Sequence, residues 1–379
     1  MKNTYLDKNE KSSCNGCGIC SLMCPVNAIK MVEDNEGFFY PQIDQSKCIH
    51  CNKCRRVCSN VNNGVNLNLA YMARLTDKEE LKKSTSGGMF YALAKYVIDN
   101  KGEVFGAEYD KNMHVRHNHY SKLSDLVKLR GTKYVRSNVF DSYNEVKTIL
   151  NDGRLVLFSG TPCQCNALKL FLEKEYDNLI TCDIICHSNP SQKIFSSFIE
   201  AIEKKYNSKV IKYYDRPKQL GWRWKNSIIV LQNNKVIKNG VYTRAFLSGI
   251  MSRPSCYYCK FADGNRVTDF TIGDMWGIEH INKEYNDNLG LSLLFINSDK
   301  AKLIFNKIKP SLECKKIDKN EALKYNHHKS ISVNKNREKF FSNFDNKKVI
   351  YKLKKYSNQF LILKVFLRLK SKLKKTNKI

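Results

Sequence analysis

The stretch Cys14–Cys24, CNGCGICSLMC, carries four cysteines in the spacing C-x2-C-x2-C-x3-C. The same spacing returns in Cys48–Cys58, CIHCNKCRRVC, where each cysteine lies 34 residues after its counterpart. The start of the chain is therefore an internal duplication. Three thiolates on one tight loop can hold three corners of an iron–sulfur cubane, while the fourth, on the short helix that follows, reaches the other cluster. Gly16 and Gly18 permit a close backbone approach, so that amides can point at the cluster.

This spacing predicts two [4Fe–4S] clusters with interlocked ligands. We expect one cluster on Cys14, Cys17, Cys20 and Cys58, and the other on Cys48, Cys51, Cys54 and Cys24. Pro25 follows Cys24 as in the bacterial ferredoxin run, whereas Ser59 follows Cys58. Zinc is the alternative, but zinc sites use four ligands as paired C-x2-C or as C-x2-C with two histidines. Two interlocked sets of four favour iron–sulfur clusters.

Length and composition limit the class of protein. The chain has 379 residues, 15 cysteines and a formal net charge of +29. This length predicts two or three domains with a real hydrophobic core. No apolar run reaches the ~18 residues of a transmembrane helix, and residues 1–11 are polar, so no secretory signal is expected. We therefore expect a cytoplasmic protein, in which cysteines bind metals or do chemistry more often than they form disulfides.

The positive charge raises the hypothesis of nucleic-acid binding. It is concentrated, however, because residues 347–379 contain 11 lysines and Arg368 but no acidic residue. We therefore expect no nucleic-acid partner. Apolar side chains lie at roughly helical spacing between these lysines, at Phe360, Leu363, Phe366, Leu367 and Leu373. Two interpretations stay open: a cationic helix on an anionic membrane surface, peripheral to its inner face, or a helix packed on the protein with its lysines in solvent.

After an Asn-rich linker, strands alternate with amphipathic helices, which predicts an α/β domain. Strands are expected over residues 69–75, 103–108, 154–159, 179–185, 269–273 and 291–296, with a further strand and turn over 34–43. Helices are expected over residues 87–100, 142–151, 161–174 and 193–206, and a hairpin over 226–243. The predicted fold class is a multidomain α+β or α/β protein. Its expected parts are a two-cluster domain (1–62), a linker (63–68), the two halves of an α/β domain (69–152 and 153–320) and a basic tail (321–379).

Three loops between these elements contain glycine, hydroxyl or cysteine residues of the kinds that bind ligands or metals. The first, STSGG at residues 84–88, precedes a helix and is typical either of a phosphate site or of an ordinary N-cap. The second, SGTPCQ at residues 159–164, ends a buried strand. The third is Cys256–Cys259, followed by TDFTIGDMWG at residues 268–277. The chain has no G-x-G-x-x-G after a strand, no P-loop, no H-E-x-x-H and no G-x-S-x-G, so an ordinary Rossmann dinucleotide site is not supported.

Together these segments resemble the beta subunit of coenzyme F420-reducing hydrogenase and its relatives. The resemblance covers roughly residues 10–310. The matching pieces, in family order, are the two-cluster segment, Ser86-Gly87-Gly88, Gly131–Val135, Gly160–Gln164, Asp183–His187, Cys256-x-x-Cys259 and Thr271–Asp274. The resemblance implies an iron–sulfur flavoprotein oxidoreductase in which a flavin, usually FAD, exchanges a hydride with a deazaflavin or another two-electron substrate. It also implies a role in polysaccharide biosynthesis as one possibility.

The resemblance implies further site residues. It places a third [4Fe–4S] cluster on Cys163, Cys186, Cys256 and Cys259, and it leaves Cys165, Cys182 and Cys314 as spare thiols. The alternative is that Cys163 and Cys186 are inert and that Cys256 and Cys259 are a leftover pair. For the flavin, it places Ser84, Ser86, Gly87 and Gly88 near the phosphates, Lys133 near the ring or diphosphate, and Thr161, Pro162 and Gln164 near the isoalloxazine edge.

The expected partners are a ferredoxin or a redox partner subunit and a small-molecule hydride donor or acceptor. Arg55 and Arg56 either steer an acidic electron carrier or are simply solvated. Two other function classes stay open. A non-enzymatic electron-transfer adapter of a larger complex would hold clusters without a flavin, and a zinc-dependent nucleic-acid binder would hold zinc without iron.

Overall fold

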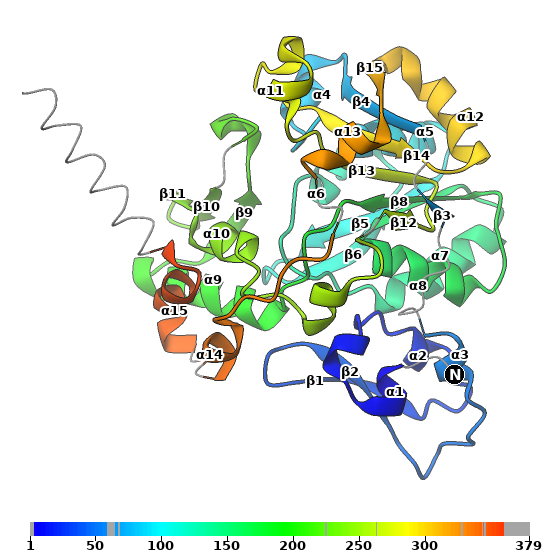
Figure 1. Ribbon diagram of the computed structural model, residues 1–379, viewed down its shortest axis with the longest axis vertical. Helices are drawn as coiled ribbons and strands as arrows, with labels where there is room; N and C mark the ends of the chain where they lie inside the picture. The colour runs from blue at the N-terminus through cyan, green and yellow to red at the C-terminus, as the bar shows by residue number, and fades with distance from the viewer. Residues whose placement is uncertain are drawn as a thin grey trace, which may run out of the picture.

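A computed structural model describes residues 4–58, 65–66, 69–223, 226–262, 264–326, 329–342, 344 and 346–359. It has three parts: a small N-terminal unit, a large mixed β-sheet covered by helices, and a side unit of helices around a three-stranded sheet (Figure 1). The predicted mixed α/β fold with an N-terminal ferredoxin-type unit is confirmed.

The N-terminal unit contains the cysteine repeat. Its elements are α1 (Tyr5–Lys8), α2 (Ile19–Leu22), β1 (Ile29–Glu33), β2 (Phe39–Ile43) and α3 (Lys53–Arg56), and β1 pairs with β2 antiparallel. The strand expected over 34–43 begins only at Phe39, because the Asp34 carboxylate accepts the amides of Glu36 and Phe38 and closes a turn. The short helices carry the third cysteine of each set, and the fourth follows the helix end. At Cys24, the following proline disfavours a further helical turn.

The large sheet has eight strands in the order β15-β4-β14-β13-β8-β7-β5-β6. They are β4 (Leu69–Leu75), β5 (Glu103–Tyr109), β6 (Val115–Tyr120), β7 (Val156–Gly160), β8 (Leu179–Ile184), β13 (Phe270–Asp274), β14 (Ser292–Ile296) and β15 (Leu312–Ile317). The central strands β13, β8, β7 and β5 run parallel, and the others pair antiparallel. The predicted strands of this sheet are all present. The sequence missed β6 and β15, which are the two edge strands and are too polar to show a buried pattern.

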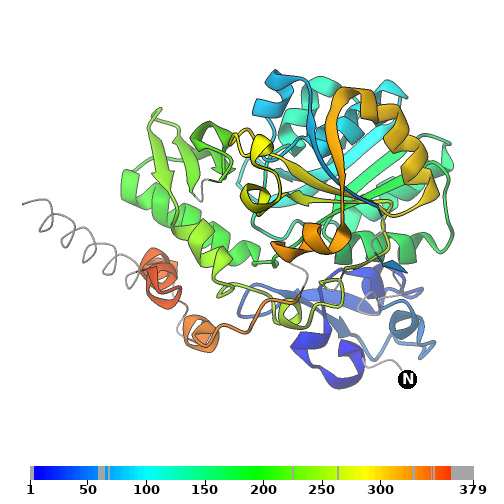
Figure 2. The same ribbon diagram turned by 45° about the horizontal axis from the view of Figure 1, so that its top comes forward.

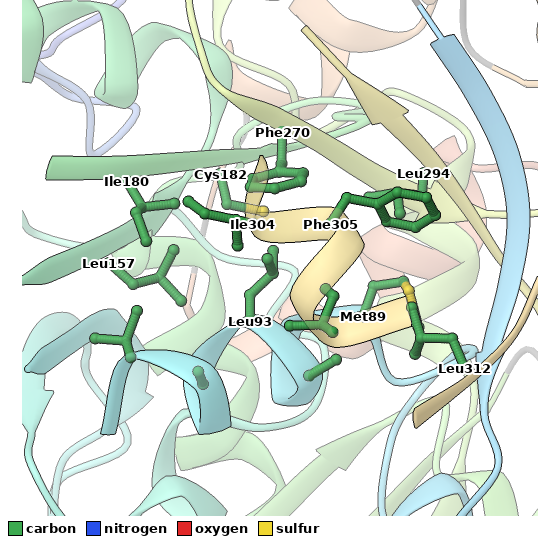
Figure 3. Close-up of a cluster of buried hydrophobic side chains, with 14 of the residues drawn as sticks. Met89, Leu93, Leu157, Ile180, Cys182, Phe270, Leu294, Ile304, Phe305 and Leu312 are labelled. Atoms are coloured by element: carbon green, nitrogen blue, oxygen red, sulfur yellow. The ribbon is translucent and has the colours of Figure 1, made fainter. Parts of the chain in front are cut away.

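Helices cover both faces of this sheet. On one face, α5 (Met89–Asp99) and α12 (Asp299–Ile308) bury Met89, Leu93 and Phe305 against Phe270 and Leu294 (Figure 3). On the other face lie α7 (Phe140–Asn151) and α8 (Pro162–Leu172), and their core continues into the N-terminal unit through Ile19 and Met23. The N-terminal unit therefore packs directly on the helical layer of the sheet (Figure 2).

The side unit consists of α9 (Gln192–Tyr206), β9 (Val210–Asp215), β10 (Ser227–Leu231), β11 (Val236–Asn239), α10 (Val241–Leu247), α14 (Arg337–Ser342) and α15 (Val349–Tyr356). The predicted hairpin is β10–β11, but it ends at Asn239 rather than at residue 243. The Asn239 side chain accepts the Val241 amide, and α10 begins there. Shorter elements are β3 (Val65–Asn66), α4 (Lys78–Lys82), α6 (Leu126–Leu129), β12 (Asn265–Arg266), α11 (Ile278–Ile281) and α13 (Lys319–Lys324); β3 falls inside the predicted linker and pairs with β12.

The basic end of the chain is described as far as residue 359. Here α15 buries Val349 and Leu353 in the core of the side unit, together with Lys352, while Lys355 is exposed. The apolar positions Phe360, Leu363, Phe366, Leu367 and Leu373 lie outside the described residues. Among the helices that the structure describes, none combines the length and the apolar character that a membrane crossing requires.

Candidate functional site

The first cysteine set is buried where the N-terminal unit meets the helical layer. Cys17 and Cys20 are buried, and Cys14 and Cys58 are partly exposed. Burial raises the pKa of Cys20 well above its usual value, and the charges of Cys17, Cys14 and Cys58 raise it further. The charge of Cys54, from the second loop, acts on Cys20 as well, so the two cysteine loops lie side by side.

The second cysteine set lies nearer to solvent. Cys51 is exposed, and Cys48 is partly exposed. Burial raises the pKa of Cys54, which also feels the charges of Cys24 and Cys51. Cys24, from the first loop, thus lies near Cys54. The two ligand sets differ in exposure, which makes the second the more accessible from outside.

Backbone amides point at two of these thiols. The Gly16 amide donates to Cys14 Sγ at 3.4 Å, and the Ala28 amide donates to Cys24 Sγ at 3.2 Å. Gly16 has φ +68, a region that glycine enters without strain. A Cβ on Gly18 would lie 2.3 Å from Phe140 Cε1, so this glycine lets the cysteine loop approach α7.

The four remaining candidate ligands line one small cavity. Cys163 lies in the first turn of α8, Cys186 follows β8, and Cys256 and Cys259 lie in and after the 3-10 turn Pro254–Tyr258. Burial and then the neighbouring Cys259 raise the pKa of Cys256 to about 12. Four thiols of this kind suit a cubane, and binding would deprotonate them.

The other three cysteines lie elsewhere. Cys182 belongs to the core of the sheet, Cys165 lies on α8 with its thiol 3.8 Å from the Cys182 carbonyl of β8, and Cys314 lies on the edge strand β15. Burial raises the pKa of both Cys165 and Cys182 well above the usual value. Within the described part of the chain, no three His, Cys, Asp or Glu side chains converge as around a single metal ion. A cubane takes one thiolate at each iron and does not need such convergence.

A second, larger cavity of about 340 Å³ lies at the carboxyl ends of the parallel strands. Open α/β sheets bind ligands at this edge, and this volume falls within the usual range of ligand pockets. Six of the eight predicted flavin residues line it, namely Ser84, Ser86, Gly88, Lys133, Thr161 and Gln164. Gly87 does not line it, because its Cα packs on the Ala73 carbonyl and the Ser292 amide. Pro162 lines the cysteine cavity instead.

One end of this cavity is suited to phosphate. Gly88, with φ +86, is the N-cap of α5 and has no side chain to satisfy the first amides of the helix. Arg130 lies beside it, donates to Ser84 Oγ at 2.8 Å and pairs with Glu80. Its Nε is buried and has no hydrogen-bond partner among the described residues. A diphosphate would satisfy both the helix amides and this guanidinium.

Lys133 and Gln164 use their hydrogen-bonding groups within the protein rather than offering them to a ligand. Lys133 Nζ donates to the carbonyls of Lys128, Leu129 and Arg130 at the end of α6, at 2.8–3.3 Å. Its three N–H bonds are therefore in use, and it offers charge rather than a free donor. Gln164 accepts from Thr161 and donates to Ser137, which fixes the first turn of α8.

We expect flavin binding to weaken as the pH rises above 7. Burial lowers the pKa of Lys133 to about 7, although Glu108 and Asp215 oppose this shift. Above pH 7 the flavin-free protein must take up a proton on Lys133 before its charge can attract a diphosphate. The dissociation constant should then rise by up to about tenfold per pH unit. Fluorescence titration with FAD between pH 6 and 9 measures this, and a Lys133→Met variant should bind more weakly with a flat profile. An equally steep profile in the variant would contradict the role of Lys133.

The sequence did not predict a group of interacting polar and aromatic side chains that lines the same cavity. Arg216, at φ +45 after β9, pairs with Asp274 at 2.7 Å and lies 4.8 Å above the Trp276 ring. Trp222 stacks on Trp276 and donates to Asp274 at 2.8 Å. Arg216, Asp274 and Trp276 all line the cavity. Asp274 stood in a motif that the sequence singled out, but nothing in the sequence marks Arg216, which meets it only through the fold.

Two family models match the chain. One describes the C terminus of the beta subunit of coenzyme F420 hydrogenase/dehydrogenase and matches residues 153–320, and the other, a 4Fe-4S dicluster domain, matches residues 13–60. Among solved structures, a chain from the xenon-derivatised F420-reducing [NiFe] hydrogenase complex of Methanosarcina barkeri is similar at 21% identity. The match covers 76% of this chain and 91% of that chain, with a TM-score of 0.48. No match was found among the curated proteins.

Proposed function

We propose that this chain, an iron–sulfur protein related to the beta subunit of coenzyme F420 hydrogenase/dehydrogenase, is a flavin-dependent oxidoreductase with three [4Fe–4S] clusters. When bound, a flavin would exchange a hydride with a small molecule and single electrons with the clusters. The substrate class that the resemblance suggests, a deazaflavin or a compound of polysaccharide biosynthesis, belongs to this proposal.

The observation that carries the proposal is the contact between the two cavities. The strand-end cavity and the four-cysteine cavity share a wall made of Thr161, Cys186, His187, Ser188 and Asn189. A cluster on the four cysteines would therefore lie directly beside a flavin in the larger cavity. Asn15, from the first ferredoxin loop, also lines the cysteine cavity. The sites thus form a series from the exposed second ligand set, through the first set, to the four-cysteine cavity and the flavin cavity.

The residues of the chain have distinct tasks in this proposal. The α5 amides and Arg130 hold the diphosphate, and Lys133 adds charge nearby. Tyr134 and Phe246, which stack at 4.1 Å, give the cavity an aromatic wall. His117 is neutral at physiological pH because burial lowers its pKa to about 4, and its Nε2 lies 2.9 Å from the Ser159 carbonyl. His117 would therefore add no positive charge to the wall of the cavity that would hold the flavin.

The partner surface in this proposal surrounds the second ligand set. Exposed Ile49 and Cys51 lie in this loop, next to Arg55 and Arg56. Arg55 forms an ion pair with Asp7 at 2.6 Å, and Arg56 donates to the Cys51 carbonyl at 2.9 Å. Such a surface suits an acidic electron carrier such as a ferredoxin, or a partner subunit.

A membrane-peripheral position is part of the same proposal. A groove between α9 and α15 is lined by five lysines, Lys204, Lys205, Lys347, Lys348 and Lys354. No acidic side chain lines this groove among the described residues. An anionic lipid surface on the cytoplasmic side would complement it.

Cofactor analysis of anaerobically purified protein tests the proposal. We expect about 12 irons and one flavin per chain, with sulfide equal to iron. About 8 irons without flavin would instead support the electron-transfer adapter, in which the strand-end cavity has no redox role. Zinc without iron would contradict both hypotheses.

A further inference from the structure

Arg253 joins the side of the cysteine cavity to the first ferredoxin loop. It precedes the turn that carries Cys256, and it is only 1% exposed. Its Nε donates to the Cys14 carbonyl at 2.7 Å, and its Nη2 donates to the Phe39 carbonyl at 2.9 Å and to Cys14 Sγ at 3.5 Å. The guanidinium also lies 4.2 Å from the Tyr40 ring centre. A residue of the flavin domain thus donates to a thiol of the ferredoxin unit.

The remaining nitrogen of this guanidinium, Nη1, faces Gly16 in the first cysteine loop. Arg253 Nη1 is buried and has no hydrogen-bond partner among the described residues. A Cβ on Gly16 would lie 2.7 Å from this nitrogen, so the glycine leaves room for the guanidinium against the loop. A buried N–H group without a partner is costly to the fold, above all when it belongs to a charged group. Sulfur atoms of a cluster bound by this loop would offer an acceptor.

Arg136 makes a second connection between the same two sites. Its Nη2 donates to the Gly16 carbonyl at 2.8 Å, and its Nη1 lies 3.9 Å from Cys163 Sγ. One side chain therefore contacts the first ferredoxin loop and a proposed ligand of the third cluster. With Arg253, it brings two permanent positive charges to the junction between the two ligand sets.

We propose that Arg253, assisted by Arg136, is a positioning residue that raises the reduction potential of the cluster on Cys14, Cys17, Cys20 and Cys58. Reduction adds negative charge to a cluster, and a nearby cation with N–H···S hydrogen bonds stabilises the reduced form. The first ligand set lies between the exposed second set and the flavin cavity. A higher potential of its cluster therefore favours electron transfer from the second cluster toward the flavin cavity. For Arg136, the inference rests on the proposed third cluster; for Arg253 it needs only the dicluster segment.

An EPR-monitored redox titration of Arg253→Gln and Arg253→Lys tests this proposal. In Arg253→Gln, the ratio of reduced to oxidised first cluster at a fixed potential should fall about tenfold, equal to a midpoint about 59 mV lower. Arg253→Lys keeps the charge and should recover part of this shift. The midpoint of the cluster on the second ligand set should not move, because Arg253 donates to no thiol of that set among the described residues. A cluster on Cys256, three residues after Arg253, should shift in the same direction as the first cluster.

Arg337→Met is the matched control. Arg337 also connects the ferredoxin unit to the rest of the chain. It forms an ion pair with Glu36 and donates to the Ser252 carbonyl, but among the described residues its hydrogen bonds reach no cysteine. It should leave every midpoint unchanged. Unmoved midpoints in both Arg253 variants, or an equal shift in Arg337→Met, would overturn the proposal. If Arg253→Gln loses iron, Arg253→Lys and Arg136→Gln decide by the same criterion. An iron content of about 8 would argue against the third cluster while leaving the Arg253 result valid.

Discussion

Replacing Cys256 by alanine is expected to lower the iron content from about 12 to about 8 per chain, while the flavin is retained. Three thiols remain in the cavity, and for two of them, Cys186 and Cys259, burial and the neighbouring cysteines raise the pKa. Neutral thiols bind iron poorly, so we expect the whole cluster to be lost rather than one ligand to be exchanged. Electrons placed on the two N-terminal clusters should then fail to reduce the flavin.

Iron and sulfide analysis measures the first effect, and the flavin absorbance after anaerobic reduction through ferredoxin measures the second. Cys314→Ala is the matched control, because Cys314 lies on the edge strand β15 outside the cysteine cavity. It should keep about 12 irons and normal flavin reduction. An unchanged iron content in Cys256→Ala would contradict the third cluster, and an equal loss in Cys314→Ala would indicate general instability.

Local spacing is why the dicluster segment was predictable from the sequence. The C-x2-C-x2-C-x3-C repeat places three thiols on one loop whatever surrounds it, and its duplication supplies the partner cysteines. The buried strands were predictable for a related reason, since β7 begins with the apolar run VLF and β14 contains the apolar run LLFI. The edge strand β15, LECKKI, places lysines toward solvent and gives no such pattern.

Long-range contacts limited the prediction of the site. Arg216 and Asp274 are 58 residues apart, and Arg253 and Cys14 are 239 residues apart, so only the folded chain brings each pair together. Gly87 shows a subtler limit. The sequence placed it correctly before the helix, but the close approach it permits is to the backbone of β4 and β14 rather than to a ligand. A glycine in a loop predicts a close approach without naming the partner.

Placing a phenylalanine at Gly106 is expected to abolish flavin binding without removing iron. Gly106 lies on β5 in the wall of the larger cavity, and its backbone does not require glycine. A Cβ there would make ordinary contacts at 3.5 Å with Leu129 and 3.6 Å with Phe90, both of which line the cavity. The aromatic ring would therefore extend into the space proposed for the flavin. We expect the dissociation constant for FAD to rise at least about 100-fold, or ~2.7 kcal/mol.

Gly106→Ala is the control for this substitution, since the added methyl group meets only ordinary van der Waals contacts. It should bind FAD within about threefold of the original protein, which corresponds to about 0.7 kcal/mol. Equilibrium titration with FAD and iron analysis of the same samples separate the two effects. Retained FAD affinity in Gly106→Phe, with the fold intact by circular dichroism, would place the flavin outside this cavity. Iron at the original level in both variants would show that the cluster sites form independently of the flavin, which their separate cysteine-lined cavity leads us to expect.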